Sequence, residues 1–347
     1  MATVTNRADY WEKARESGFD LSWLEQLKEN IQGETTNEFS ENNTGRVEGS
    51  IPRGNVPQFG AYTFRTKKDI WAHNLTKLYQ EFVTRQWSSA TDIPWETIEP
   101  LPDEIEAAEC QLATFFAQVE FVASDVPGRF ISTMSPDYHE VRLVLLAQVM
   151  DESRHLDVFR KRALANGGGL MRMIDTVSDV VGGSTDNARE FTELSSRLHI
   201  TGEGNVLTLF RLGELMAYNE AEKAIYRRCA QDEARHVAIG VLHLRYMNEC
   251  NPERREEIHS YLDEGESRQS SGAGGENPAA RNILTSEALA VLLGGGKDKT
   301  DEGQKILMAI RQRQTKEYFQ RLKSAGFDDR ITNGRVNPAL LEVYNPN

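Results

Sequence analysis

Apolar residues recur at a helical period along most of the chain. Between residues 67 and 86 one stripe is formed by Ile70, Trp71, Leu75, Leu78, Tyr79 and Phe82, which would share a helix face. Similar patterns, bounded by proline, glycine or asparagine, predict four long helices and a last amphipathic one. They cover residues 102–124, 135–166, 187–215, 219–248 and 304–325. The pattern predicts an all-α protein with four core helices.

The flanking parts of the chain are less regular. We expect residues 1–66 to be an irregular segment with one short helix near residues 10–31, and residues 67–250 to form the helical bundle. Residues 251–347 would form a C-terminal extension. In it, the Gly- and Ser-rich residues 264–280 have too little apolar content to order themselves and predict a mobile loop. The last helix would pack on the bundle.

Composition narrows the class of protein. The chain has 347 residues and a formal net charge of −13, so we expect no nucleic-acid partner, because phosphate binding needs clustered lysine and arginine. No stretch approaches the ~18 consecutive apolar residues of a membrane span, and the first residues lack the apolar centre of a signal peptide. Three cysteines without metal-ligand spacing fit a reducing compartment. We therefore expect a cytoplasmic protein that does not enter a membrane.

One five-residue motif occurs twice, as DESRH at residues 151–155 and as DEARH at residues 232–236. Each copy places a glutamate and a histidine three residues apart, so both side chains leave the same helix face and can bind one metal ion. A single Glu-x-x-His is common on exposed helices. Two copies on separate core helices indicate a site for two metal ions.

Two upstream glutamates complete the predicted ligand set. Glu120 lies 32 residues before Glu152 within an apolar run, and Glu203 lies 30 residues before Glu233. Near-equal intervals imply two helical hairpins of the same build. The predicted metal ligands are Glu120, Glu152, His155, Glu203, Glu233 and His236.

Several neighbours remain as alternatives or additions. Glu109 is an alternative to the first ligand, and Glu193 or Glu214 to the ligand on the third core helix. His199 is a candidate extra ligand, and His243 a weaker one. Five apolar residues near the ligands would form either ordinary core or a substrate pocket: Phe115, Phe116, Phe121, Leu207 and Phe210.

The other charged residues of the two motifs have predicted supporting roles. A metal-binding histidine usually donates its second ring N–H to a carboxylate, and in an antiparallel bundle the aspartate of each motif can reach the histidine of the other. The arginines would offset part of the buried negative charge. These supporting residues are Asp151, Asp232, Arg154 and Arg235.

Through these residues the sequence resembles the ferritin-like di-iron carboxylate superfamily over residues 102–248. Acyl-carrier-protein desaturases and multicomponent monooxygenase hydroxylases carry similar paired motifs. Small subunits of ribonucleotide reductase typically have a radical-bearing tyrosine where this chain has Phe159, and arylamine N-oxygenases have a third histidine where it has Cys229. The branch within the superfamily is therefore left open. The resemblance implies a ferritin-like four-helix bundle with additional flanking helices that holds two iron ions, although the same ligands suit manganese.

The resemblance also implies an oxidoreductase that activates dioxygen to oxidise an organic substrate. The first expectation is a monooxygenase that hydroxylates or N-oxygenates a small or hydrophobic molecule. The alternatives are a desaturase-like enzyme and a non-catalytic or iron-handling ferritin-like protein. Because the chain has no Gly-x-Gly-x-x-Gly nucleotide fingerprint, the electron donor would be a separate reductase or ferredoxin. A homodimer is an open alternative to a monomer.

Overall fold

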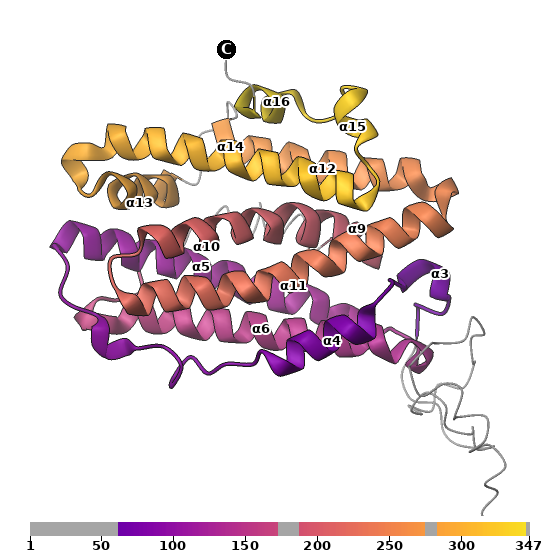
Figure 1. Ribbon diagram of the computed structural model, residues 1–347, viewed down its shortest axis with the longest axis horizontal. Coiled ribbons are helices and arrows are strands. Elements are labelled where there is room, and N and C mark those ends of the chain that lie inside the picture. Colours follow the sequence, from indigo (N-terminus) through magenta and orange to yellow (C-terminus); the bar gives the residue numbers. More distant parts are fainter. Residues whose placement is uncertain (1–61, 173–186, 275–282, 345–347) are drawn as a thin grey trace, which may run out of the picture.

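Helices form nearly all of the described structure. The computed structural model describes residues 62–172, 187–274 and 283–344 (Figure 1). Within these ranges the only β-type pairing is an isolated bridge between Phe64 and Met134, so the all-α prediction is confirmed. The predicted helix near residues 10–31 lies outside the described residues.

The predicted core helices are present. They are α5 (Asp103–Ile131), α6 (His139–Leu164), a third helix made of α9 (Phe191–Ser195), η5 (Ser196–Glu203) and α10 (Gly204–Met216), and α11 (Glu220–Cys250). The η5 segment is a π-helix of 8 residues inside an otherwise α-helical run. Helix α5 packs along α6, and α10 along α11, which gives the two hairpins implied by the motif spacing.

Helix α11 begins where its sequence provides caps. The side chain of Asn219 accepts a hydrogen bond from the backbone N–H of Glu222, and the Glu222 carboxylate accepts one from the N–H of Tyr218. This reciprocal arrangement satisfies N–H groups that have no partner within the helix. The start of α11 therefore lies at the residue that the sequence indicated.

Helix α5 is longer than predicted, since it continues past Ser124 to Ile131 through Pro127. Proline removes one backbone hydrogen bond and normally ends or kinks a helix. Here Val126 and Phe130 are both buried, and the Phe130 ring contacts Phe64 and Phe191 with ring centroids 5.6 and 6.3 Å apart. Tertiary packing outweighs the local penalty.

The single helix predicted over residues 67–86 is wrong, because the segment forms α3 (Lys67–Ile70) and α4 (Leu75–Thr84). The break lies at Asn74, which has a φ of 62°. Asparagine tolerates this left-handed region better than most residues. The break also frees the carbonyl of Trp71, which lies 3.1 Å from Nδ1 of His243.

The mobile loop predicted over residues 264–280 is also wrong in its first part. Helix α12 runs from Arg255 to Gly274, while residues 275–280 lie outside the described residues. The buried Glu266 carboxylate accepts hydrogen bonds from the Tyr318 hydroxyl at 2.5 Å and from Arg330 at 2.8 Å. These partners come from distant parts of the sequence, so a local reading of composition could not find them.

The C-terminal helices cover one side of the bundle. Helices α12, α13 (Ile283–Gly294) and α14 (Thr300–Ala325) form a layer above α9 and α10, and the short α15 (Asp329–Thr332) and α16 (Pro338–Tyr344) lie beyond it (Figure 1). Helix α14 confirms the predicted last helix, whereas α13 had no clear sequence signal. Single-turn helices are η1 (Trp95–Thr97), η2 (Pro136–Tyr138), η3 (Ala165–Gly167), η6 (Pro252–Arg254) and η8 (Lys297–Lys299).

Two groups of buried apolar side chains form the core. One includes Phe82 and Phe191, and the other includes Phe116 and Phe210. The described helices include none that combines the length and apolar character needed to cross a membrane. The polar residues of the two motifs lie where the two apolar groups meet, as the ring contacts described below show.

Candidate metal centre

The structure brings all six predicted ligands together inside the bundle. Helix α5 supplies the first, α6 the next two, the end of η5 the fourth and α11 the last two. None has more than 4% of its surface exposed. These residues are Glu120, Glu152, His155, Glu203, Glu233 and His236.

The six residues form two overlapping groups. One contains Glu120 and His155, the other contains Glu203 and His236, and both contain Glu152 and Glu233. Within each group, one potential ligand atom from every residue lies within 4.8 Å of the others. The two shared glutamates come from the two motifs, so each motif contributes to both groups.

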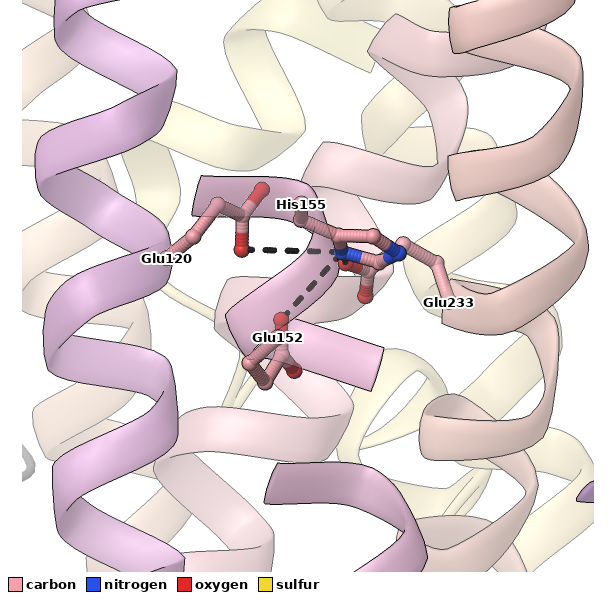
Figure 2. Close-up of side chains that lie close together, drawn as sticks. All are labelled: Glu120, Glu152, His155 and Glu233. Atoms are coloured by element: carbon pink, nitrogen blue, oxygen red, sulfur yellow. Dashed lines mark ion pairs between the residues drawn. The ribbon is translucent and has the colours of Figure 1, made fainter. Parts of the chain in front are cut away.

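The His155 ring shows the geometry of the first group. Its Nδ1 lies 3.3 Å from Glu152, 3.4 Å from Glu233 and 3.9 Å from Glu120. Figure 2 shows these carboxylates turned toward the ring. In the second group, Nδ1 of His236 lies 3.0 Å from Glu152 and 3.5 Å from Glu233. Both imidazoles therefore turn Nδ1 toward the carboxylates.

Among the residues that the structure describes, many of these buried polar atoms have no hydrogen-bond partner. They include Oε1 of Glu120, both carboxylate oxygens of Glu152, Oε2 of Glu203 and of Glu233, and Nδ1 of both histidines. An unsatisfied buried polar group costs about 1–3 kcal/mol, and more when it is charged. Carboxylate oxygens and imidazole nitrogens that converge without partners fit a pair of metal ions.

The aspartate of each motif lies beside the histidine of the other motif. Nε2 of His155 lies 3.1 Å from Asp232, within hydrogen-bond distance. Nε2 of His236 lies 3.5 Å from Asp151, which is an ion-pair distance. Each histidine thus has its second nitrogen against the aspartate of the other motif.

The two arginines lie on the outer side of these aspartates. Arg235 donates to Asp151 at 3.1 Å and also to Asp232, while Arg154 donates to Asp151 and lies 3.4 Å from Asp232. Two cations and two anions thus form one buried network. The arginines offset the charge of the aspartates rather than contact the predicted ligands directly.

Trp87 is a member of this network that the sequence did not reveal. Its indole N–H donates to Asp232 at 2.7 Å, and the guanidinium of Arg154 lies 5.5 Å from its ring centroid. The ring stacks near His155 with centroids 6.4 Å apart. Trp87 lies beyond α4 without a motif around it, so only the folded structure identifies it.

The candidate extra ligand His199 lies outside both groups. Its ring nitrogens lie 3.1 Å from the Ser195 hydroxyl and 3.2 Å from the Gln148 carbonyl oxygen, and the Gln148 amide donates to Glu203 at 2.7 Å. Burial, followed by the nearby His236, lowers the pKa of His199 to about 3. His199 is thus a neutral hydrogen-bonding residue one step behind Glu203.

The alternative ligands have other positions. His243 lies between the Thr192 hydroxyl and the Trp71 carbonyl. Glu193 pairs with Arg197, Glu214 pairs with Arg227, and Glu109 lies in a separate pocket described below. None of these residues belongs to either group.

Burial dominates the electrostatics of the centre. It raises the pKa of Glu120, and the adjacent Glu152 raises it further. Burial would also raise the pKa of Asp232, but the hydrogen bond and charge of His155 lower it to about 2, so this residue is an anion. Burial raises the pKa of Cys229 to about 12, which keeps its thiol protonated beside His155.

The predicted pocket residues are mostly core. Phe116, Leu207 and Phe210 are buried, and Phe115 packs against them. The Phe210 ring contacts His155, with centroids 6.3 Å apart. The prediction for Phe121 is wrong, since 58% of its surface is exposed on the outer side of α5. One ring on the other side, Phe82, stacks on His236 at 5.8 Å. The centre therefore lies between two apolar walls.

Comparison with solved structures shows the ferritin-like helical-bundle fold. An R2-like ligand-binding oxidase with an aerobically reconstituted Mn/Fe cofactor is 16% identical, with a TM-score of 0.54 over 73% of this chain and 93% of its own. A point mutant of an R2-like ligand-binding oxidase, also with an aerobically reconstituted Mn/Fe cofactor, is 17% identical, with a TM-score of 0.55 over 73% of this chain and 94% of its own. No protein-family model matches the chain, and no curated protein matches it in sequence.

Proposed function

We propose that the chain is an oxidoreductase that holds two metal ions in the centre and uses dioxygen to oxidise an organic substrate. The observation that carries this proposal is the pair of buried groups that share Glu152 and Glu233. Four glutamates and two histidines supply oxygen and nitrogen donors, and several of these buried atoms have no hydrogen-bond partner among the described residues. Four ionised carboxylates would carry four negative charges, which two divalent cations balance.

The residues around the ligands support this assignment. Asp232 and Asp151 would hold the two imidazoles with Nε2 outward, so that Nδ1 faces the metal. The Gln148 amide, which donates to Glu203, would fix that carboxylate's orientation. Bound iron, or iron with manganese, would supply the electrons and open coordination positions that dioxygen reduction requires.

The apolar walls favour an organic substrate and would exclude water from the reaction. The solved structures with a similar fold are R2-like ligand-binding oxidases with a Mn/Fe cofactor, which supports dioxygen chemistry and keeps both metal pairs open. Within this class we propose a monooxygenase, with desaturation as the alternative outcome. A separate reductase or ferredoxin would return electrons to the metals.

Metal analysis of the purified chain tests the centre. We expect two metal ions per chain in the wild type. Glu120→Ala should lose one, because that residue belongs to a single group, whereas Glu233→Ala should lose both. Glu214→Gln, a change at a glutamate outside both groups, is the control and should keep two. Equal metal content in all four proteins would contradict the proposed ligands.

Dioxygen uptake separates an oxygenase from an iron-handling protein. A single turnover of the reduced, metal-loaded chain should consume dioxygen without accumulating further iron, and an accepted substrate should gain an oxygen atom or lose two hydrogens. Mass spectrometry after reaction with labelled dioxygen distinguishes these outcomes. Uptake of many irons per chain would instead establish storage, and would overturn the oxidoreductase assignment.

A further inference from the structure

A second site lies at one end of the bundle, beneath α13. The pocket lies between α5, α10, α11, α13 and α14, and its empty volume of about 490 Å³ includes space open to solvent. Its walls are mainly apolar and include Leu112, Leu209, Leu289 and Leu292. The hydroxyl of Tyr218 donates to the Leu292 carbonyl at 2.8 Å, which ties α13 to the segment before α11.

One carboxyl group interrupts this apolar lining. Glu109 is only 4% exposed, yet its carboxyl has no hydrogen-bond or ion-pair partner among the described residues. Tyr226, which also lines the pocket, has a hydroxyl without such a partner in the same part of the structure. Neither group is among the fully buried unpaired atoms, so both open onto the pocket, where water or a polar group of a ligand can pair with them. Two polar groups without a protein partner that line one apolar pocket are where a ligand's polar group would bind.

The charges around Glu109 identify the sign of that ligand. Arg162, the nearest cation, is already committed to Glu106 at 2.7 Å and to Glu222 at 2.7 Å. Three carboxyl groups therefore surround one guanidinium. Burial, with Glu222 and Glu106 adding to it, raises the pKa of Glu109 to about 8. A carboxylate ligand would add to this excess of negative charge, whereas a cation would reduce it.

We propose that this pocket binds an apolar amine, with its ammonium group donating to Glu109 and to the Tyr226 hydroxyl. The hydrocarbon part of the ligand lies against the leucines of α10 and α13. Below a pH of about 8, Glu109 releases its proton to solvent when the ammonium binds. The charge-assisted hydrogen bond that results in a low-dielectric pocket is strong, and the apolar lining adds the hydrophobic contribution. Both parts of the ligand then have a partner.

This site is separate from the metal centre. Glu109 lies three helical turns, or about 16 Å, before Glu120 on α5, and Phe116 stands between them, its ring 5.0 Å from that of Phe210. Binding of the amine therefore does not need bound metal. A failure of the chain to bind the amine can therefore be told apart from a failure of the proposed oxidase function.

Calorimetric titration of the purified chain with hexylamine, hexanol and hexanoate tests the proposal. We expect hexylamine to bind at least about tenfold more tightly than hexanol, and hexanoate not to bind. Glu109→Gln, which keeps the side-chain volume, should weaken hexylamine at least about tenfold and leave hexanol unchanged. Glu104→Gln, the same substitution nearer the surface of the same helix, is the matched control and should bind as the wild type does.

The comparison among ligands on the wild type keeps the proposal testable even if a variant fails to fold. Equal affinity for hexylamine and hexanol would show an apolar pocket without amine recognition, and would overturn the proposal. Absence of hexylamine binding would overturn it as well. Titration after metal removal by chelation should give the same affinities, which separates this result from the behaviour of the metal centre.

Discussion

A histidine can bind a metal only through a nitrogen that no other group occupies. In both motifs Nε2 faces an aspartate, at 3.1 Å for His155 and 3.5 Å for His236, so Nδ1 is the atom left for a metal. Because each aspartate belongs to the other motif, neither motif can orient its histidine alone. In the structure, each copy of the duplicated motif therefore depends on the other copy to orient its histidine.

This dependence predicts a graded effect of variants around Asp232. Asp232→Asn should lower metal affinity by roughly 10- to 100-fold, since a neutral amide holds the imidazole less firmly. Trp87→Phe removes only the indole donor and should have a smaller effect in the same direction. Competition with a metal-binding dye measures both affinities. Asp157→Asn, at a partly exposed aspartate of α6, is the control. If Asp232→Asn and Trp87→Phe bound metal as tightly as this control, the proposed orienting role would be refuted.

A second residue-scale prediction concerns Glu109 and pH. Its pKa is about 8 in the folded chain against an ordinary value of 4.5, so between these values the unfolded chain loses a proton that the folded chain keeps. Stability from this group therefore falls as pH rises through this window. The charged groups that face Glu109 are the same in the wild type and in a variant at this position: Glu222, Glu106 and Arg162.

Glu109→Gln removes this titration. The gain in unfolding free energy over the wild type should be at least about 1 kcal/mol larger near pH 8 than near pH 5. Urea unfolding at the two pH values measures this difference. An equal gain in unfolding free energy at both pH values would show that the pKa of Glu109 is not raised in the folded chain.

At the scale of elements, periodicity located the core helices, because a buried stripe is a local property of the sequence. It did not locate the break at Asn74, the π-helical η5 or the second half of α12. The first and the last of these depend on distant partners: His243 for the carbonyl freed beside the break, and Tyr318 with Arg330 for the buried Glu266 of α12. Such contacts leave no pattern within one helix.

The close approach of η5 to α11 gives an element-scale prediction. A Cβ on Gly240 would lie 2.5 Å from Cβ of His199, near the backbone and unable to move aside. Gly240→Ala should therefore push η5 and its Glu203 away from α11, lowering stability by roughly 1–3 kcal/mol and weakening metal binding. Denaturant unfolding and metal titration measure the two effects.

Gly128→Ala is the matched control, because a Cβ at that helical position on α5 meets nothing within 4 Å. It should leave metal binding unchanged and stabilise the chain by roughly 0.5–1 kcal/mol, since alanine favours a helix over glycine. If Gly240→Ala behaved like this control, η5 and α11 would not be in the close contact that positions Glu203.

At the scale of the molecule, the predicted ligands were accessible from the sequence because four core helices and a repeated motif leave few ways to converge. The residues that surround these predicted ligands could not be predicted from the sequence. Trp87 and Gln148 come from positions without a motif, and the pocket at Glu109 exists only because α13 closes it. The exposed Phe121 shows the converse limit: it is adjacent in sequence to the predicted ligand Glu120, but one residue along a helix turns the side chain by about 100°, here toward solvent.

The convergence of four glutamates predicts how metals affect the stability of the whole chain. With metal absent, buried carboxyl groups repel one another or must bind protons. A metal that binds only the folded chain adds about 2.7 kcal/mol at a free concentration of 100 times its Kd. For a chain of 347 residues, Tm should rise by roughly 4 °C for each such ion on loading with iron or manganese.

Glu120→Gln separates this linkage from ordinary loss of stability. Its amide mimics the protonated carboxyl that burial favours, so the metal-free variant should be at least as stable as the metal-free wild type. Loaded with metal, the variant should be less stable than the loaded wild type, because one group has lost a ligand. Calorimetry of the four samples gives both comparisons. A variant that is destabilised equally with and without metal would show that Glu120 serves only in packing.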